Sequence, residues 1–244
     1  MTSRAHRTRS SAVMAQRREP PDSLDFFPTP PWATRALFET LWADVAPLRA
    51  LTAWDPACGQ GHMAEPLRDI FGLVHASDVW PYGYGAVQDF TFDDRPPGGA
   101  VDWIVTNPPF NIATLFFERA IDVARTGVAF LVRLQFLETQ DRYHEIFDIH
   151  PPTVIAFFAD RVPMIRGAWD PEASTATAYV WLVWIRDAAR KPPVWIPPGA
   201  ARRYTRMSDM QLATPGEAAR RREVQEARSG DAATGTRRSE KGKD

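Results

Sequence analysis

The sequence contains very little lysine. Of its 29 basic residues only three are lysines, Lys191, Lys241 and Lys243, and none lies in the first 190 residues. A lysine that holds phosphate in a glycine-rich loop, or one that forms a Schiff base, is therefore excluded for that part of the chain. No Tyr-x-x-x-Lys pair is present either, which argues against hydride chemistry of that type.

Cysteines and long apolar runs are also scarce. Cys58 is the single cysteine, so neither an internal disulfide nor a four-cysteine zinc site can form, and no metal is expected. The longest apolar run, residues 178–185, is far shorter than the roughly 20 residues that span a bilayer. The Arg-rich start lacks the apolar segment of a signal peptide. We expect a soluble cytoplasmic protein with no membrane partner. Its excess of Arg, Ala and Pro suggests a bacterial or phage-infected host cell.

The charge is distributed unevenly along the chain. Residues 1–21 carry a net charge of +4 and residues 198–244 also carry +4, which leaves −9 for the middle of a chain whose total is −1. Both ends are poor in large apolar side chains, so we expect them to be disordered. The sequence thus predicts a basic tail over 1–22, one domain over 23–190, and a Pro-rich, then charged and disordered, tail over 191–244. The alternative is that the tails are arms that contact nucleic-acid phosphates.

Strand-like and helix-like patterns alternate from about residue 31 to residue 185. This alternation predicts the α/β class, with a doubly wound Rossmann-like sheet of about seven parallel strands joined by crossover helices. Strands are expected at 51–55, 73–78, 86–90, 101–106, 127–134, 154–158 and 178–185, and helices at 31–46, 62–71, 111–125 and 137–149. The long loop 159–177 is expected to contact the substrate, because long loops in compact domains are often functional.

A glycine turn follows the first predicted strand. It reads Asp55-Pro56-Ala57-Cys58-Gly59-Gln60-Gly61, and its glycines permit close backbone approach to a ligand. The spacing Gly59-x-Gly61-x-x-Ala64 fits a relaxed dinucleotide fingerprint, so the turn alone does not choose between NAD and S-adenosylmethionine. A carboxylate at Asp55 suits the cationic amino and sulfonium groups of S-adenosylmethionine and would repel a pyrophosphate. We therefore favour S-adenosylmethionine, with Asp55, Ala57, Gly59 and Gly61 as binding residues.

Two further acids follow strands and are candidate cofactor ligands. Asp78 ends the second predicted strand, where an acid accepts hydrogen bonds from both ribose hydroxyls. Asp89 ends the third, and either binds the adenine amine of the cofactor or caps a helix or loop. The neighbouring Phe90 either packs on the adenine ring or belongs to the core.

The most specific pattern is Thr106-Asn107-Pro108-Pro109-Phe110, at the carboxyl end of the fourth predicted strand. An aromatic amine is a poor nucleophile because its lone pair is delocalised. The side-chain carbonyl of Asn107 and the backbone carbonyl of Pro108 can accept its hydrogens and draw the nitrogen toward tetrahedral geometry. The two prolines fix these oxygens in place, and Phe110 offers a face for a flipped-out base. This motif predicts direct methyl transfer, in which Cys58 is not needed as a nucleophile.

The chain resembles a known family through three segments in order: Phe26-Phe27-Pro28-Thr29-Pro30, the glycine turn, and Asn107-Pro108-Pro109-Phe110. They are similar to those of the amino-methylating DNA methyltransferases, and most similar to compact, phage-type N6-adenine enzymes. The resemblance implies an adenine-specific DNA methyltransferase with the class I methyltransferase fold. The DNA would be a duplex with a flipped adenine, or single-stranded. The resemblance also implies that Phe27 and Thr29, with Trp32 as a third candidate, help to bind the cofactor.

The stretch Arg133-Leu134-Gln135-Phe136-Leu137-Glu138 also resembles the phage-type group, although it can equally be read as an ordinary strand end. Larger family members carry a separate target-recognition domain. Here only the loop 159–177, with Arg161 and Arg166 as candidate phosphate contacts, and the tails remain. A short or relaxed target site is therefore predicted.

The carbonyl clamp does not identify the substrate by itself. RNA adenine, protein glutamine and cytosine N4 are methylated by comparable arrangements, and they remain open alternatives. A catalytically inactive module that binds nucleic acid is a further one. Phe110 and Asn107 favour adenine on resemblance. The oligomeric state is not predicted.

Overall fold

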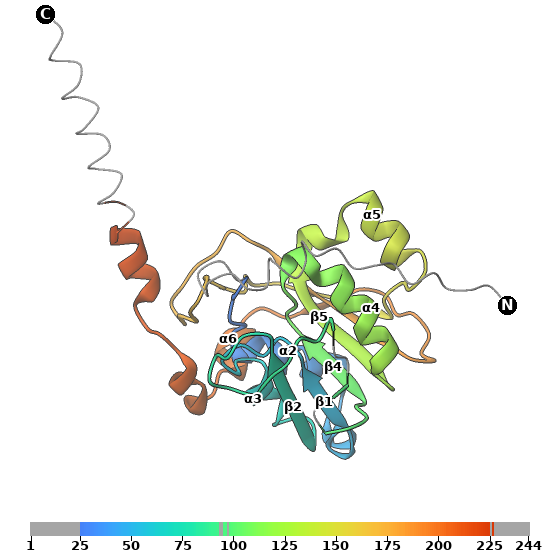
Figure 1. Ribbon diagram of the computed structural model, residues 1–244. Coiled ribbons are helices and arrows are strands. Elements are labelled where there is room, and N and C mark those ends of the chain that lie inside the picture. Colours follow the sequence, from blue (N-terminus) through green and yellow to red (C-terminus); the bar gives the residue numbers. More distant parts are fainter. Residues whose placement is uncertain (1–24, 93–94, 97, 225, 227–244) are drawn as a thin grey trace, which may run out of the picture.

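A mixed eight-stranded sheet forms the centre of the computed structural model, which describes residues 25–92, 95–96, 98–224 and 226 (Figure 1). The strand order is β3-β2-β1-β4-β5-β7-β6-β8. The strands are β1 (Thr52–Asp55), β2 (Leu73–Asp78), β3 (Ala86–Val87), β4 (Trp103–Thr106), β5 (Gly127–Arg133), β6 (Val154–Phe158), β7 (Tyr179–Ile185) and β8 (Val194–Ile196). The predicted α/β class with a doubly wound sheet is confirmed, with one strand more than the approximate seven.

The prediction of a wholly parallel sheet is wrong at β7. This strand runs antiparallel to both of its neighbours, pairing Arg133 with Tyr179 on one side and Phe157 with Val180 on the other. The physical reason lies in the connection from β6 to β7, which is the long loop and contains no crossover helix. An antiparallel neighbour does not need such a helix, whereas a parallel one does.

Helices cover both faces of the sheet. The side chains of β5 point alternately to the two faces and therefore belong to two separate cores. Ala129 and Leu131 join a core under α2 (Pro31–Leu41), and Val128 and Phe130 join a second core under α4 (Ala113–Val123). A strand buried on both faces reads as a continuous apolar run. Figure 1 shows these two helices on opposite sides of the strands.

The helices are shorter than predicted. α2 ends at Leu41 instead of residue 46, and the expected helix 62–71 is reduced to α3 (Ala64–Leu67) with flanking turns. Pro66 lacks the N–H that would bond to the carbonyl of His62, which weakens the start of a longer helix. The other helical segments are η2 (Ala46–Ala50), η3 (Phe110–Ile112), η4 (Leu134–Leu137), α5 (Gln140–Arg142), η5 (Tyr143–Phe147), α6 (Ala200–Tyr204) and η6 (Met207–Leu212). The helix expected at 137–149 is thus broken into several short pieces.

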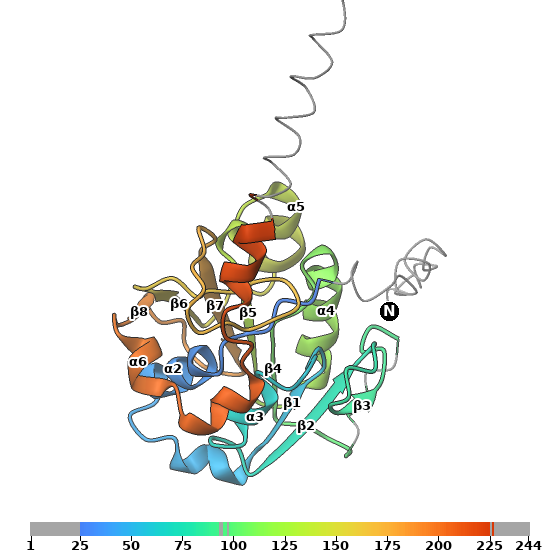
Figure 2. The ribbon, with the colours of Figure 1, turned by 90° about the vertical axis from the view of Figure 1, so that its left-hand side faces the viewer.

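The C-terminal part of the chain packs on the domain well beyond residue 191. β8 pairs with β6, and α6 lies beside α2 (Figure 2). Arg35 of α2 donates hydrogen bonds of 2.8 and 2.9 Å to the buried carboxylate of Asp209 in η6. The prediction of a tail from residue 191 is therefore wrong for residues 194–212. The predicted tail 1–22 and residues 227–244 lie outside the described residues. No helix among the described residues has the length and apolarity needed to cross a membrane.

Candidate active site

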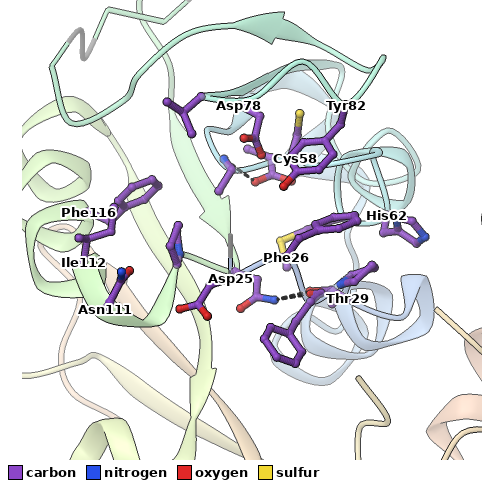
Figure 3. Close-up of a pocket in the computed structure, with 18 of the residues that line it drawn as sticks. Asp25, Phe26, Thr29, Cys58, His62, Asp78, Tyr82, Asn111, Ile112 and Phe116 are labelled. Carbon is purple, nitrogen blue, oxygen red and sulfur yellow. Dashed lines mark hydrogen bonds between the residues drawn. The ribbon is translucent and has the colours of Figure 1, made fainter. Parts of the chain in front are cut away.

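A cavity lies at the carboxyl ends of β1, β2 and β4 (Figure 3). In Figure 3, Phe116, Ile112 and Asn111 line the side of the cavity that is away from His62. The predicted site residues that line it are Phe27, Thr29, Asp55, Ala57, Asp78, Asp89, Asn107 and Pro109. The structure therefore brings together residues of the three segments that the sequence singled out, although they are far apart along the chain.

Asp55 lies almost fully buried in the cavity wall, with 1% of its surface exposed. Its Oδ1 accepts hydrogen bonds from Thr106 Oγ1 (2.8 Å) and from the backbone N–H of Ala57 (3.3 Å). Burial raises the pKa of Asp55 to about 7, because these two hydrogen bonds only partly offset the loss of water, and the charge of Asp78 adds to the shift. A buried carboxylate of this kind is stabilised by a cation in the cavity.

Asp78 is the second buried acid of the site. Its two oxygens accept backbone hydrogen bonds from Gly59 (2.8 Å) and Trp80 (3.0 Å), and thereby tie the glycine turn to the end of β2. Burial raises the pKa of Asp78 to about 6, while the backbone hydrogen bonds lower it. Two carboxylates with raised pKa values in one cavity mark a functional-site candidate with a preference for positive charge.

The two glycines of the turn adopt a backbone conformation that other residues rarely take. Both have positive φ, +51° at Gly59 and +89° at Gly61, which L side chains rarely adopt. A Cβ at Gly59 would run into the ring of Phe26, and one at Gly61 would lie 2.6 Å from the ring of Tyr84. Gly59 and Gly61 do not line the cavity as far as it is described. They instead shape the turn and leave room for two aromatic rings.

Asp89 and Phe90 separate in the structure. Asp89 lines the cavity, and its Oδ1 caps the next turn by accepting from Thr91 N (2.9 Å) and Thr91 Oγ1 (2.7 Å). Phe90 is 1% exposed and lies in the core, with its ring centroid 5.0 Å from those of Trp54 and Phe116. Of the two interpretations of Phe90, the structure shows the core position. The ring that faces the cavity there is Phe116, which the sequence analysis missed.

Asn107 is held by the segment that precedes the first helix. Its Nδ2 donates to the backbone carbonyl of Phe27 (3.0 Å), to Thr29 Oγ1 (3.1 Å) and to Met164 Sδ (3.7 Å). These bonds fix the amide so that its Oδ1 faces away from them. Within the described part of the chain, this buried Oδ1 has no hydrogen-bond partner. An open buried acceptor is costly unless a ligand satisfies it.

The remaining residues of the Asn-Pro-Pro-Phe motif are placed around this amide. Pro108 is buried and Pro109 lines the cavity. Phe110 lies outside the cavity lining, next to Phe27, with 5.4 Å between their ring centroids. Phe27 therefore forms part of the wall between the cavity and the Phe110 ring.

The long loop 159–177 contacts the site from outside. Gly167 N donates to the carbonyl of Phe26 (2.7 Å), and Met164 Sδ contacts both Thr29 and Asn107. The expectation that this loop reaches the substrate is not tested, but the loop does hold the segment that orients Asn107. No sequence signal marked Met164, because its contact with Asn107 spans 57 positions.

His62 connects the cavity to the C-terminal segment. It lines the cavity, is 2% exposed, and its Nε2 lies 2.9 Å from the carbonyl oxygen of Leu212. Burial lowers the pKa of His62, so the ring is neutral and Nε2 carries the hydrogen that the carbonyl accepts. Its buried Nδ1 is then an acceptor with no partner among the described residues. The same residues contain no cluster of three His, Cys, Asp or Glu that could hold a metal ion.

No protein-family model matches the sequence, and no curated protein matches it. Solved structures do match. One is the methyltransferase subunit of a type I restriction-modification system from Streptococcus thermophilus, with 10% identity and a TM-score of 0.50, covering 68% of this chain and 45% of that one. The chain has the Rossmann-like fold of class I methyltransferases.

Two other structures with this fold are similar at lower TM-scores. The 23S rRNA methyltransferase ErmE has 12% identity and a TM-score of 0.42, covering 73% of this chain and 75% of its own. The magnesium protoporphyrin IX methyltransferase from Synechocystis PCC 6803 has 16% identity and a TM-score of 0.44, covering 64% and 79%. In an open α/β fold, ligands bind where the strand order reverses. Here that point lies between β1 and β4, which carry Asp55 and Thr106 at their carboxyl ends.

Proposed function

We propose that the protein is an S-adenosylmethionine-dependent methyltransferase that methylates the exocyclic N6 amine of adenine in DNA. The observation that carries this proposal is the buried Oδ1 of Asn107, which has no hydrogen-bond partner among the residues that the structure describes. A rigid carbonyl oxygen with no internal partner is the group that an aromatic NH2 requires from an enzyme.

The cavity chemistry fits the cofactor. S-adenosylmethionine supplies, when bound, a methyl group on a sulfonium, together with an α-ammonium group. Asp55, whose burial raises its pKa to about 7, loses its proton more readily beside such a cation. In this proposal Asp78 accepts hydrogen bonds from the ribose, and Asp89 and Phe116, which also line the cavity, contact the adenine ring.

Asn107 performs the central catalytic role in this proposal. Its Oδ1 accepts one hydrogen of the substrate amine, and the backbone carbonyl of Pro108 is the expected acceptor of the other. A bound S-adenosylmethionine would supply the methyl group, so that the new nitrogen–carbon bond would form as the carbon–sulfur bond of the sulfonium breaks. The amine held by Asn107 would lose one proton to solvent. Thr29 and the carbonyl of Phe27 keep the amide in the reactive orientation throughout.

DNA adenine is the favoured substrate for two reasons. The motif ends in Phe110, as in the N6-adenine enzymes that the sequence resembles. The similar structure from Streptococcus thermophilus is a methyltransferase subunit of a restriction-modification system. Phosphate contacts would come from arginines that include Arg161 of the loop and Arg202 of α6, both exposed. The proposal includes a short or relaxed target site.

The decisive experiment is methyl transfer from labelled S-adenosylmethionine to unmethylated DNA, followed by mass spectrometry of the nucleosides. The variants are Asn107→Ala and, as a matched control, Gln140→Ala, which removes an exposed amide on α5. We expect N6-methyladenine from the wild type and the control, and a loss of at least about 100-fold in Asn107→Ala, the size of effect seen for single charge-stabilising donors.

Other products would redirect the proposal. N4-methylcytosine would identify cytosine as the target base. Labelled RNA or labelled protein with unmodified DNA would identify one of the other planar amines. S-adenosylmethionine binding without transfer to any of these polymers would support a non-catalytic module.

A further inference from the structure

Arg133 covers the aromatic ring on which the target base is expected to stack. Its guanidinium carbon lies 3.9 Å from the ring centroid of Phe110 and 5.3 Å from that of Phe27. Arg133 ends β5 and is paired with Tyr179, the first residue of the antiparallel β7. A guanidinium at this distance makes a cation–π contact and takes up the ring face that it covers.

Two further aromatic rings lie near Phe110. Phe27 lies 5.4 Å and Tyr179 lies 6.5 Å from Phe110 between ring centroids. Tyr179 also forms a side-chain hydrogen bond with Arg133, in which the guanidinium donates. The guanidinium in its present position and a base that stacks on the face of Phe110 that Arg133 covers therefore exclude each other, because one ring face holds one planar group.

The contacts of Arg133 are incomplete. Its Nε is buried and has no hydrogen-bond partner among the described residues. Buried donors are normally satisfied, so this Nε can still donate a hydrogen bond to an incoming group. The next two residues, Leu134 and Gln135, are exposed, so the strand end from which Arg133 projects lies at the surface.

We propose that Arg133 holds the place of the target base on Phe110 in the free enzyme and yields it when the base enters. The displaced guanidinium then contacts a phosphate of the flipped nucleotide. This proposal rests on the proposed function, since it takes the substrate to be a base in a nucleic acid. Stacking of a base on an aromatic ring is at least comparable in strength to an exposed cation–π contact, so the exchange is energetically accessible.

The two parts of this role predict opposite effects in one variant. In Arg133→Leu the ring face is free and the phosphate contact is lost. We expect 2-aminopurine riboside, which has no phosphate, to bind about 3- to 10-fold more tightly than to the wild type, since a competing cation–π contact has gone. We expect DNA to bind several-fold more weakly. Both are measured with the cofactor site saturated with S-adenosylhomocysteine, the nucleoside by quenching of its fluorescence.

A second variant separates charge from planarity. Arg133→Lys keeps the positive charge but lacks the planar fork, so it should regain most of the DNA affinity while still binding the nucleoside more tightly than the wild type. A residue with only a structural role would weaken both ligands when it is replaced. A residue that only contacts phosphate would leave nucleoside binding unchanged.

The result that overturns the proposal is nucleoside affinity in Arg133→Leu that is equal to or lower than in the wild type, or undetectable. This outcome is distinguishable from failure of the proposed function. Absence of methylated adenine in DNA with the wild-type enzyme contradicts the proposed function. The nucleoside measurement asks only whether a planar base and the guanidinium compete for Phe110, and it does not depend on methyl transfer.

Discussion

The side-chain amide of Asn107 donates a hydrogen bond of 3.1 Å to the hydroxyl oxygen of Thr29, which precedes it by 78 positions. A second bond from the same nitrogen reaches the carbonyl of Phe27. Because both partners accept, the nitrogen must point toward them and the amide oxygen away. The residues ahead of the first helix thus determine which end of Asn107 is presented to a substrate.

Replacing Thr29 with Val should therefore slow methyl transfer. The variant keeps the shape of the side chain but removes an acceptor, and loss of one such bond of about 1 kcal/mol predicts a fall in kcat of about 5-fold or more. The Kd of S-adenosylmethionine should change less than kcat. Thr29→Ser, which restores the hydroxyl, is the matched control and should regain most of the activity. Equal kcat in Thr29→Val and the wild type would show that Phe27 alone orients the amide.

The position of the site could be predicted because it depends on strand ends. Asp55 and Thr106 each close a strand of strongly apolar pattern, and parallel neighbours bring their carboxyl ends to one edge. The same logic placed Asp78. Phe27 and Thr29 were identified through the resemblance alone, since no local pattern indicates that the segment before a helix reaches a strand end.

Two kinds of contact could not be predicted from the sequence. Some join residues far apart along the chain, and others involve segments whose local composition indicates a different structure. β8 lies between Pro192-Pro193 and Pro197-Pro198, whose composition is typical of a linker, yet it pairs with β6 at the edge of the sheet, where neighbouring prolines are tolerated. The role of Phe90 could not be predicted for a different reason. Its position after a strand fits both a ligand contact and a core residue, and only packing against Trp54 decides between them.

Cofactor affinity should depend on pH through Asp55. In the free protein its pKa is raised to about 7, and a bound cation stabilises the ionised form and lowers that pKa. Binding then releases a proton, so affinity should rise as the pH increases through about 6 to 7 and level off above that. Isothermal titration calorimetry at pH 5.5 and 8 in buffers of different ionisation enthalpy measures both the affinity and the proton release. Asp55→Asn should bind weakly and without this pH dependence.

The same acid should make the free protein less stable at neutral pH. Its folded pKa is raised above the usual value of 3.8, so between about pH 4 and 7 the folded state binds more protons than the unfolded state. Stability is therefore lost as the pH rises through this window, by an amount on the order of a few kcal/mol. Asp55→Asn should show a higher urea midpoint than the wild type at pH 8 and a similar one at pH 4. Equal midpoints at pH 8 would contradict the burial of a charged Asp55.

The terminal regions should contribute to nucleic-acid binding through charge alone. Removing residues 1–22 and 227–244 deletes a basic N-terminal region and further basic residues at the other end. We expect weaker DNA binding and a shallower slope of log Kd against log salt concentration, because fewer counterions are released. A truncated protein with the same salt slope as the full chain would limit the phosphate contacts to the described domain.

The Arg35–Asp209 pair should stabilise the packing of the C-terminal segment Met207–Leu212 against the domain. Arg35 contacts Asp69 (2.7 Å), both oxygens of Asp209, and the carbonyl of Tyr204 (3.0 Å), and its side chain is 7% exposed. Replacing Arg35 with Met leaves the Asp209 carboxylate buried without its partner, which should cost about 3–5 kcal/mol of unfolding free energy in urea titration.

Two further variants serve as controls for the Arg35→Met measurement. Arg202→Met, at an exposed position on the neighbouring α6, should change stability by less than about 0.5 kcal/mol. The double variant Arg35→Met with Asp209→Asn should be more stable than Arg35→Met alone, because the unpaired buried charge is gone. Since Leu212 of the same segment accepts the hydrogen bond of His62, loss of the pair should also weaken cofactor binding. Unchanged cofactor affinity in a destabilised Arg35→Met would show that His62 keeps its position without the segment.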